Sequence, residues 1–190
     1  MKFLILGDIF GPPGMSVIKS KLKNIINEKK IDFTIVNGEN AADNGLGITR
    51  KNFEELIGAG VNIVTSGNHV WDQKEIIETI NNDKRLIRPA NFIEGQPGSG
   101  YGIYLFKDKK VAVMNLIGNV FMQKSQDLFS YTDKFIKKIL LKKHADFIIV
   151  DIHGEVTSEK LALGHFLDGK VTAVVGTHTH VPTSDYKILE

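Results

Sequence analysis

The sequence feature that most constrains the fold is an alternation between short apolar runs and amphipathic stretches. The runs are rich in β-branched and aromatic residues and read, in chain order, FLIL, FTIV, NIVT, VAVMNL, FIIV and TAVV. Short, continuously apolar strands that alternate with helices are typical of a mostly parallel sheet covered on both faces. The alternation therefore predicts an α/β protein.

The stretches between these runs carry apolar residues at helical spacing. Residues 15–29 predict one helix, residues 127–143 predict the longest, and Ser158 begins another. Asp72 and Glu75 have the spacing of a capping box at the start of a further helix.

One segment departs from the alternation. The runs YGIYLF and VAVMNL are joined by the polar residues KDKK, which predicts an antiparallel hairpin. Because the sequence contains no internal repeat, low-complexity tract or linker, we expect one domain over residues 1–190.

Composition excludes several kinds of site and partner. The chain has 190 residues, a formal charge of +2 and no cysteine, so disulfides, iron–sulfur clusters, thiolate zinc sites and cysteine nucleophiles are excluded. The small net charge gives no reason to expect a nucleic-acid or membrane partner. Asp8 interrupts the first apolar run, which is too short for a signal peptide, and no run approaches membrane-spanning length. We therefore expect a cytoplasmic protein.

Polar residues follow five of the predicted strands, at the point where each strand ends. They form the clusters Gly7-Asp8, Asn37-Gly38-Glu39-Asn40, Gly67-Asn68-His69, Asp151-Ile152-His153-Gly154 and Thr177-His178-Thr179-His180. The carboxyl ends of parallel strands lie along one edge of a sheet, where open α/β proteins bind ligands. We therefore expect these side chains to lie near one another.

Each cluster taken alone has an ordinary structural explanation. A lone aspartate after a strand, such as Asp8, is more often a helix cap or turn former than a ligand. Asn40 and Asn68 suit turns with left-handed backbone, and His153 is compatible with a buried core histidine. Taken together, the five clusters favour a metal site over a structural coincidence.

The histidines strengthen this interpretation, because four of the six fall in the clusters. His178 and His180 stand two residues apart in the last predicted strand, so we expect their side chains on one face, where they can chelate one ion. His144 and His165 lie in predicted helices, and we expect them to be solvated or part of the core.

The candidate ligands are too many for one ion. They are Asp8, Glu39, Asn40, Asn68, His153, His178 and His180. A carboxylate can bridge two ions, so the set predicts two metals. Nitrogen and oxygen donors without sulfur suit iron, manganese or zinc better than calcium or magnesium. The charges of two divalent ions outweigh those of Asp8, Glu39 and a bridging hydroxide, which favours a phosphate ester as substrate.

The clusters GDIF, GEN, GNHVWD, DIHG and GTHTH resemble, in order and spacing, the motifs of the calcineurin-like metallophosphoesterases. The stretches NGENAADNGLGIT and SGNHVWD are closely similar to the YmdB-type subfamily of bacterial metallophosphoesterases, and the resemblance covers essentially the whole chain. Three positions depart from the superfamily pattern. Phe10 stands where the first motif has histidine, Glu39 where it has the bridging aspartate, and Thr177 precedes the final histidine pair.

The resemblance implies the metallophosphoesterase fold, with two packed mixed β-sheets flanked by helices in α-β-β-α layers. It also implies two transition-metal ions, iron or manganese with zinc as an alternative, bridged by Glu39. The first ion would also be bound by Asp8, Asn40 and His180. The second would also be bound by Asn68, His153 and His178. Asn40 would replace the ligand that is absent at Phe10.

The resemblance further implies a hydrolase of phosphate esters. A metal-bridging hydroxide would attack phosphorus, and His69 would protonate the departing oxygen. The other interpretation of His69 is a residue that only orients the site. The subfamily is associated with phosphodiesterase activity, notably on 2′,3′-cyclic nucleotides.

The chain is shorter than the resemblance predicts. Members of the subfamily continue for several strands beyond GTHTHVPTSDYKILE, so we expect the second sheet to lack C-terminal strands and to leave one edge bare. Two explanations stay open: a second copy in a homo-oligomer covers the edge, or the sequence is truncated at its C-terminus. Two other function classes also stay open, namely a metal-binding regulatory or scaffold protein with little or no turnover and a metal-free, flavodoxin-like binding module.

Overall fold

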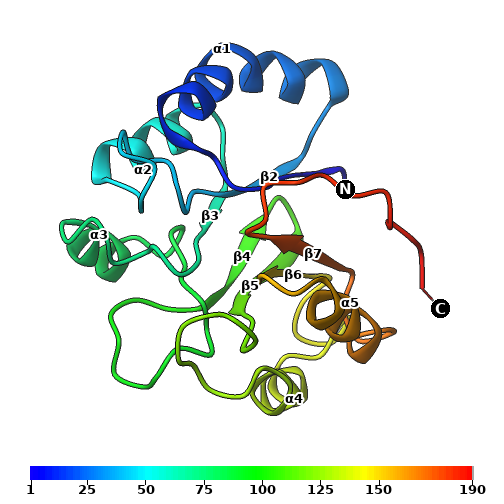
Figure 1. The fold of residues 1–190 in the computed structure, drawn as a ribbon. Helices are drawn as coiled ribbons and strands as arrows, with labels where there is room; N and C mark the ends of the chain where they lie inside the picture. Colours follow the sequence, from blue (N-terminus) through cyan, green and yellow to red (C-terminus); the bar gives the residue numbers. More distant parts are fainter. Residues whose placement is uncertain (190) are drawn as a thin grey trace. The chain divides into compact units, whose positions relative to one another are not determined.

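The computed structural model describes residues 1–189 and divides into two compact units. The N-terminal unit comprises residues 1–88 and 97–99, and the C-terminal unit comprises residues 89–96 and the chain from residue 100 onward. Each unit contains one sheet and its own helices (Figure 1). The α/β class with two sheets flanked by helices is confirmed, whereas one domain over residues 1–190 stays a prediction.

The short segment 97–99 returns to the N-terminal unit and is held there by Arg88. The Arg88 guanidinium donates to the Pro97 carbonyl with 2.8 Å between Nε and O, and the Arg88 backbone N–H donates to the Ser99 carbonyl at 3.0 Å. Arg88 is buried, so carbonyl oxygens replace part of the water that its charge would otherwise need.

The sheet of the N-terminal unit is parallel. Its strands are β1 (Phe3–Leu6), β2 (Phe33–Asn37) and β3 (Ile63–Thr65), paired in that order. Strand β2 is buried along its whole length because it lies between the other two strands. All three strands run in one direction, so their carboxyl ends share one edge of the sheet.

Helices connect these strands. They are α1 (Gly11–Lys29), α2 (Arg50–Gly58) and α3 (Ile76–Asn82). Helix α1 starts four residues before the predicted start of the 15–29 helix. Pro12 and Pro13 occupy its first turn, where the missing N–H groups cost nothing.

The capping box predicted at Asp72 and Glu75 is wrong. Helix α3 begins at Ile76 without a hydrogen bond from the side chain of Glu75, its N-cap residue. Both carboxylates have other partners: Asp72 Oδ2 lies 2.7 Å from His69 Nδ1, and Glu75 Oε1 accepts the backbone N–H of Arg50 at 2.9 Å.

The sheet of the C-terminal unit is mixed. Its strands are β4 (Tyr101–Phe106), β5 (Lys109–Ile117), β6 (Phe147–His153) and β7 (Ala173–Thr177), paired in that order. The predicted hairpin is confirmed as the antiparallel pair β4 and β5, whereas β5, β6 and β7 run parallel.

Helices α4 (Leu128–Lys138) and α5 (Thr157–Phe166) pack on one face of this sheet (Figure 1). The core between them and the sheet includes Leu128, Phe135, Leu163 and Leu167 from the helical side and Met114, Leu116, Ile148, Val150 and Ile152 from the strands. Because side chains alternate along a strand, Asp151 and His153 of β6 belong to the opposite face.

The expectation that residues 127–143 form the longest helix is wrong. Helix α4 has 11 residues and α1 has 19, because Ile139 adopts extended backbone and ends α4. His144 therefore lies in a turn, not in a helix, and its Nδ1 accepts the Leu140 N–H at 3.0 Å. His165 lies in α5 as predicted.

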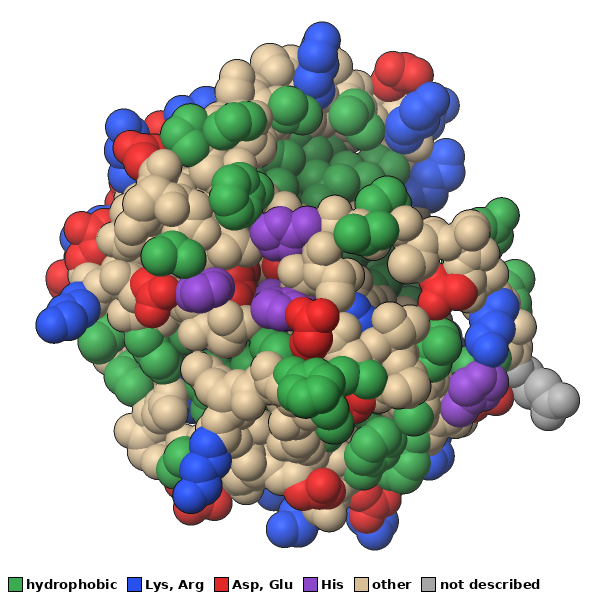
Figure 2. Space-filling model, viewed as in Figure 1, with side chains coloured by type: hydrophobic (Ala, Val, Ile, Leu, Met, Phe, Trp, Pro, Cys, Tyr) green, Lys and Arg blue, Asp and Glu red, His purple; other side chains and the backbone are tan. Residues whose placement is uncertain are grey.

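The surface carries charges of both signs. Figure 2 shows Lys and Arg side chains scattered among Asp and Glu side chains over the face that it draws, as expected for solvated surfaces of a chain with a net charge of +2. Within residues 1–189, no helix combines the length and apolar character needed to cross a membrane.

Candidate metal centre

The segments that follow β1, β2 and β3 run side by side at the carboxyl edge of the N-terminal sheet. The Ile9 N–H donates to the Asn37 carbonyl at 2.9 Å, and the Gly38 N–H donates to the Thr65 carbonyl at 2.9 Å. These hydrogen bonds continue the parallel pairing past the ends of the strands. They bring the segments that carry the predicted oxygen ligands to one place in this unit.

Glu39 is held by backbone groups in a buried turn. Its own N–H donates to Asn37 Oδ1 at 3.0 Å, and its Oε1 accepts the backbone N–H of His69 at 3.1 Å. The preceding Gly38 leaves no room for a side chain, because an added Cβ would lie 2.8 Å from Val64 Cγ1. The tight approach of this turn to β3 therefore depends on glycine.

Asn40 is also held by the backbone. Its Nδ2 donates to the Gly45 carbonyl at 2.8 Å, and its own carbonyl accepts the Gly11 N–H at 2.8 Å. Gly45 has φ +75°, and an added Cβ there would lie 3.0 Å from the ring of Phe10. With the amide nitrogen engaged by Gly45, Oδ1 is the Asn40 atom suited to a metal.

Two carboxylate oxygens of the N-terminal unit are buried and accept no hydrogen bond from residues 1–189. They are Asp8 Oδ1 and Glu39 Oε2. A buried carboxylate oxygen is costly unless a hydrogen bond or a cation compensates it. Together with the neutral amides, these two carboxylates form an all-oxygen donor set, which suits hard cations such as manganese, magnesium or calcium.

His69 forms a pair with Asp72. Its Nδ1 lies 2.7 Å from Asp72 Oδ2, and both side chains are partly exposed. An ionised carboxylate accepts hydrogen bonds but cannot donate them. His69 therefore carries a proton on Nδ1, and its Nε2 faces away from Asp72. Sequence reasoning missed this role of Asp72, although an acid three residues after the histidine was the available signal.

In the C-terminal unit, β6 and the segment after β7 bring two predicted ligands into contact. His153 ends β6 and is fully buried. Its Nε2 lies 3.0 Å from Nδ1 of His178, whose Nε2 lies 3.0 Å from Glu155 Oε2. The two imidazoles are therefore close enough to serve one ion.

The expectation that His178 and His180 lie in a strand is wrong. Strand β7 ends at Thr177, and the two histidines follow it with φ +102° and +55°. Such backbone is uncommon for residues other than glycine, and it persists where the surrounding structure requires it, often at functional sites. The spacing of two residues thus does not act through strand geometry here, and His180 is exposed.

The predicted ligands fall into two groups, one in each unit. The oxygen group of the N-terminal unit consists of Asp8, Glu39, Asn40 and Asn68, and the imidazole group of the C-terminal unit consists of His153, His178 and His180. The union of all seven in one dinuclear centre stays a prediction.

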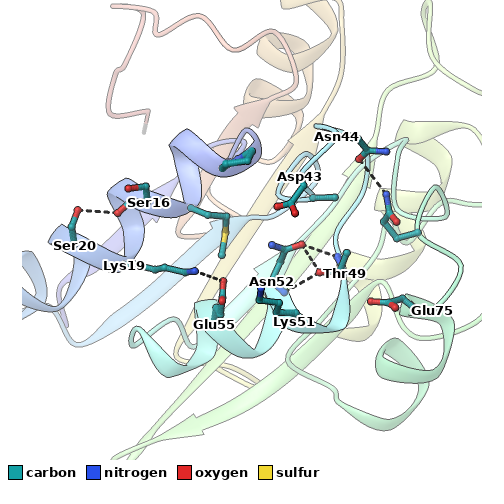
Figure 3. Close-up of a pocket in the computed structure, with 14 residues that line it drawn as sticks. Ser16, Lys19, Ser20, Asp43, Asn44, Thr49, Lys51, Asn52, Glu55 and Glu75 are labelled. Atoms are coloured by element: carbon teal, nitrogen blue, oxygen red, sulfur yellow. Dashed lines mark hydrogen bonds and ion pairs between the residues drawn. The ribbon is translucent and has the colours of Figure 1, made fainter.

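A separate cavity of about 830 Å³ lies between α1, α2 and the loop that follows Asn40. Figure 3 shows Lys19 of α1 and Glu55 of α2 pointing toward each other across it, and their ion pair measures 2.7 Å between Nζ and Oε2. Thr49 and Asn52 form the capping box of α2 at its edge. None of the seven predicted ligands is among the described residues that line this cavity, so it is not the candidate centre.

Known proteins resemble this chain over nearly its whole length. A family model described as YmdB-like protein matches residues 4–190. The 2′,3′-cyclic-nucleotide 2′-phosphodiesterase of Bacillus subtilis (strain 168) is 45% identical over 189 residues, which cover 100% of this chain and 70% of the relative.

Solved structures agree with this match. A crystal structure described as a novel phosphatase, from Mycoplasma pneumoniae, has a TM-score of 0.91 at 38% identity and covers 99% of this chain and 67% of its own. The 5′-nucleotidase from Candida albicans SC5314 has a TM-score of 0.58 at 15% identity and covers 94% and 42% respectively. The latter likeness shows the fold alone.

Proposed function

The chain belongs to the YmdB-like family, and from this membership we propose that it is a metal-dependent phosphodiesterase acting on 2′,3′-cyclic nucleotides. The relatives are a phosphodiesterase and a phosphatase, and both names denote hydrolases of phosphate esters. The chain is accordingly an enzyme of that class. The finer proposal, a cyclic-nucleotide substrate and two metals, rests on the relative's name and on the donor groups described above.

The single observation that carries the metal proposal is the pair of buried carboxylate oxygens, Asp8 Oδ1 and Glu39 Oε2. We assign Glu39 to both ions and propose iron or manganese, with zinc as the alternative. We further assign the first ion to Asp8, Asn40 and His180. The second ion is assigned to Asn68, His153 and His178. When bound, the ions would supply positive charge to the phosphate oxygens and acidify a water molecule.

The choice of donors also explains why an anionic ester would be accepted. Only two of the seven ligands are carboxylates, and the others are neutral amides and imidazoles. Two divalent ions would exceed the charge of Asp8 and Glu39, so the loaded site would attract a phosphodiester. Additional carboxylates in place of Asn40 and Asn68 would weaken that attraction.

His69 is proposed as the proton donor. Asp72 Oδ2 lies 2.7 Å from Nδ1, so Nε2 is the ring nitrogen that would face a departing oxygen. Hydrolysis of a cyclic diester adds a hydroxyl to phosphorus and breaks the bond from phosphorus to one ribose oxygen. An alkoxide is a poor leaving group, so the departing oxygen needs a proton. His69 would give that proton from Nε2 when both of its ring nitrogens are protonated, and the neutral ring that remains would keep the Nδ1 proton directed at Asp72.

The test is hydrolysis of 2′,3′-cyclic AMP and bis-p-nitrophenyl phosphate with added Mn²⁺. We expect turnover by the unmodified protein, loss of turnover in Asp8→Ala, and unchanged turnover in Asp108→Ala. Asp108 is a matched control because it lies in the exposed turn between β4 and β5. Equal rates for the unmodified protein and Asp8→Ala would contradict the enzymatic proposal and favour a binding or scaffold role.

A further inference from the structure

We propose that Asp151 and Thr177 are positioning residues that hold His153 in the single tautomer able to bind a metal through Nε2. This inference rests on the proposed function, because His153 is one of the ligands assigned there. It concerns two residues that are not ligands themselves. Thr177 is also one of the positions where the sequence departs from the superfamily motifs.

Strand geometry brings the three side chains together. Asp151 and His153 are two residues apart in β6, so they lie on the same face of the sheet. In the parallel register of β6 and β7, His153 pairs with Thr177. The hydroxyl of Thr177 therefore lies beside His153 and diagonal to Asp151.

The hydrogen bonds form a chain with one direction. Thr177 Oγ1 donates to Asp151 Oδ1 at 2.8 Å, and His153 Nδ1 lies 3.0 Å from the same hydroxyl oxygen. A hydroxyl has one proton, and Thr177 uses that proton in its hydrogen bond to the Asp151 carboxylate. Toward His153 the oxygen can then only accept, so the imidazole carries its proton on Nδ1 and leaves Nε2 with a lone pair.

Burial makes these hydrogen bonds decisive for the tautomer of His153. Asp151, His153 and Thr177 are exposed by 2%, 0% and 7%, so water does not offer the ring an equivalent alternative partner. In such an environment, a residue behind a ligand fixes both the ring orientation and the tautomer. A threonine hydroxyl here transmits the effect of a carboxylate that does not itself contact the imidazole.

The position of His178 supports the direction in which Nε2 points. His178 Nδ1 lies 3.0 Å from His153 Nε2. Metal–nitrogen distances are about 2.1 Å, so two nitrogen atoms this close together could bind the same ion. The nitrogen that Thr177 leaves unprotonated is thus the one that faces the neighbouring ligand.

The decisive measurement on the unmodified protein is the tautomer of His153 without metal. Long-range ¹⁵N–¹H correlation spectra distinguish a proton on Nδ1 from one on Nε2, and comparison with His153→Gln identifies the signal. We expect the proton on Nδ1. A proton on Nε2 would overturn the proposal, and this readout requires neither turnover nor bound metal.

The matched variants are Thr177→Val, which keeps the shape but removes the hydroxyl, and Thr177→Ser, which keeps the hydroxyl. We expect Thr177→Val to weaken Mn²⁺ binding by about 10- to 100-fold and Thr177→Ser to stay close to the unmodified protein, as measured by competition with a chelating indicator. Equal affinities for the valine variant and the unmodified protein would overturn the inference.

The design separates this inference from the function on which it rests. If the unmodified protein binds no transition metal, the proposed centre fails, and the His153 tautomer alone then decides the positioning role. Circular dichroism shows whether Thr177→Val folds. If it does not fold, the tautomer of the unmodified protein again decides the question.

Discussion

The two groups of predicted ligands are held in different ways. In the N-terminal unit, backbone groups hold the oxygen ligands: Glu39 accepts the His69 N–H, and Asn40 donates to the Gly45 carbonyl. In the C-terminal unit, side chains hold the imidazoles: Thr177 contacts His153. The first arrangement depends on where the chain turns, and the second on which side chains neighbouring strands place opposite each other. The two units should therefore respond to different kinds of substitution.

The largest effect should come from Glu39, the ligand proposed for both ions. We expect Glu39→Gln to lose both metals, as measured by elemental analysis, and to fall to the activity of the metal-free protein. His153→Gln should lose one metal, because His153 is assigned to one ion. If the two variants keep the same amount of metal, Glu39 does not bind both ions. The oxygen and imidazole groups would then contribute more equally to metal binding than proposed.

The next effect should come from His69, whose ring is held by the side chain of Asp72. We expect His69→Gln to slow hydrolysis of 2′,3′-cyclic AMP by about 10²- to 10⁴-fold without loss of metal. Hydrolysis of bis-p-nitrophenyl phosphate should slow less, because p-nitrophenolate leaves without a proton. Asp72→Asn should show the same substrate dependence to a smaller extent.

Equal slowing of both substrates would contradict the proton-donor role of His69. It would leave His69 with the orienting role that the sequence also allowed.

A smaller effect should test the backbone support of Asn40. We expect Gly45→Ala to lower the free energy of unfolding by more than about 1 kcal/mol, because φ is +75° and the new Cβ would lie 3.0 Å from the Phe10 ring. The matched control is Gly164→Ala in α5, where an added Cβ meets nothing within 4 Å. That change should raise the free energy of unfolding by about 0.5–1 kcal/mol. Urea unfolding measures both.

If Gly45→Ala is as stable as the unmodified protein, the turn that holds Asn40 adapts easily. The contrast between backbone and side-chain support would then lose its main physical basis.

The smallest effect should come from Asp127, which caps α4 far along the chain from any ligand. The backbone N–H of Ser130 donates to its carboxylate and lowers the pKa of Asp127 below its ordinary value of 3.8. Asp127→Asn keeps a capping oxygen, so we expect a loss of only about 0.3–1 kcal/mol at neutral pH. Metal binding should not change.

The sign of the pH dependence follows from the lowered pKa. The stabilisation from ionised Asp127 is complete above pH 3.8 and is lost as the pH falls through the lower pKa of the folded protein. Thermal unfolding of the unmodified protein and Asp127→Asn should therefore converge in acid. A difference that grows toward low pH would contradict this assignment.

The sequence predicted the strands and the positions of their polar ends well, because a buried strand needs a continuous apolar run and parallel strands share one carboxyl edge. For that reason the sequence could place Asp8, Glu39 and Asn40 at one edge of the sheet, whereas their role as metal ligands stays a prediction. The start of α1 was missed because the helical spacing of apolar residues begins at Met15, whereas Pro12 and Pro13 fit a first helical turn.

The contacts behind the ligands could not be predicted. The pairing of His153 with Thr177 depends on the register between β6 and β7, which residue spacing alone does not specify. The role of Asp72 was mistaken because the same spacing also fits a capping box. The left-handed backbone of His178 and His180 had no signal in the sequence, since neither residue is glycine.

The return of residues 97–99 to the N-terminal unit affects when this unit can finish folding during synthesis on the ribosome. Arg88 finds its carbonyl partners at Pro97 and Ser99, so this unit is complete only when Ser99 has left the exit tunnel. By then residues 89–96 are already outside, and they await the strands of the other unit, since domains fold as units during synthesis. A nascent chain of that length contains all the predicted oxygen ligands and none of the predicted imidazole ligands. Loading of a centre that uses both groups would therefore wait until the segment with His178 and His180 has also left the exit tunnel.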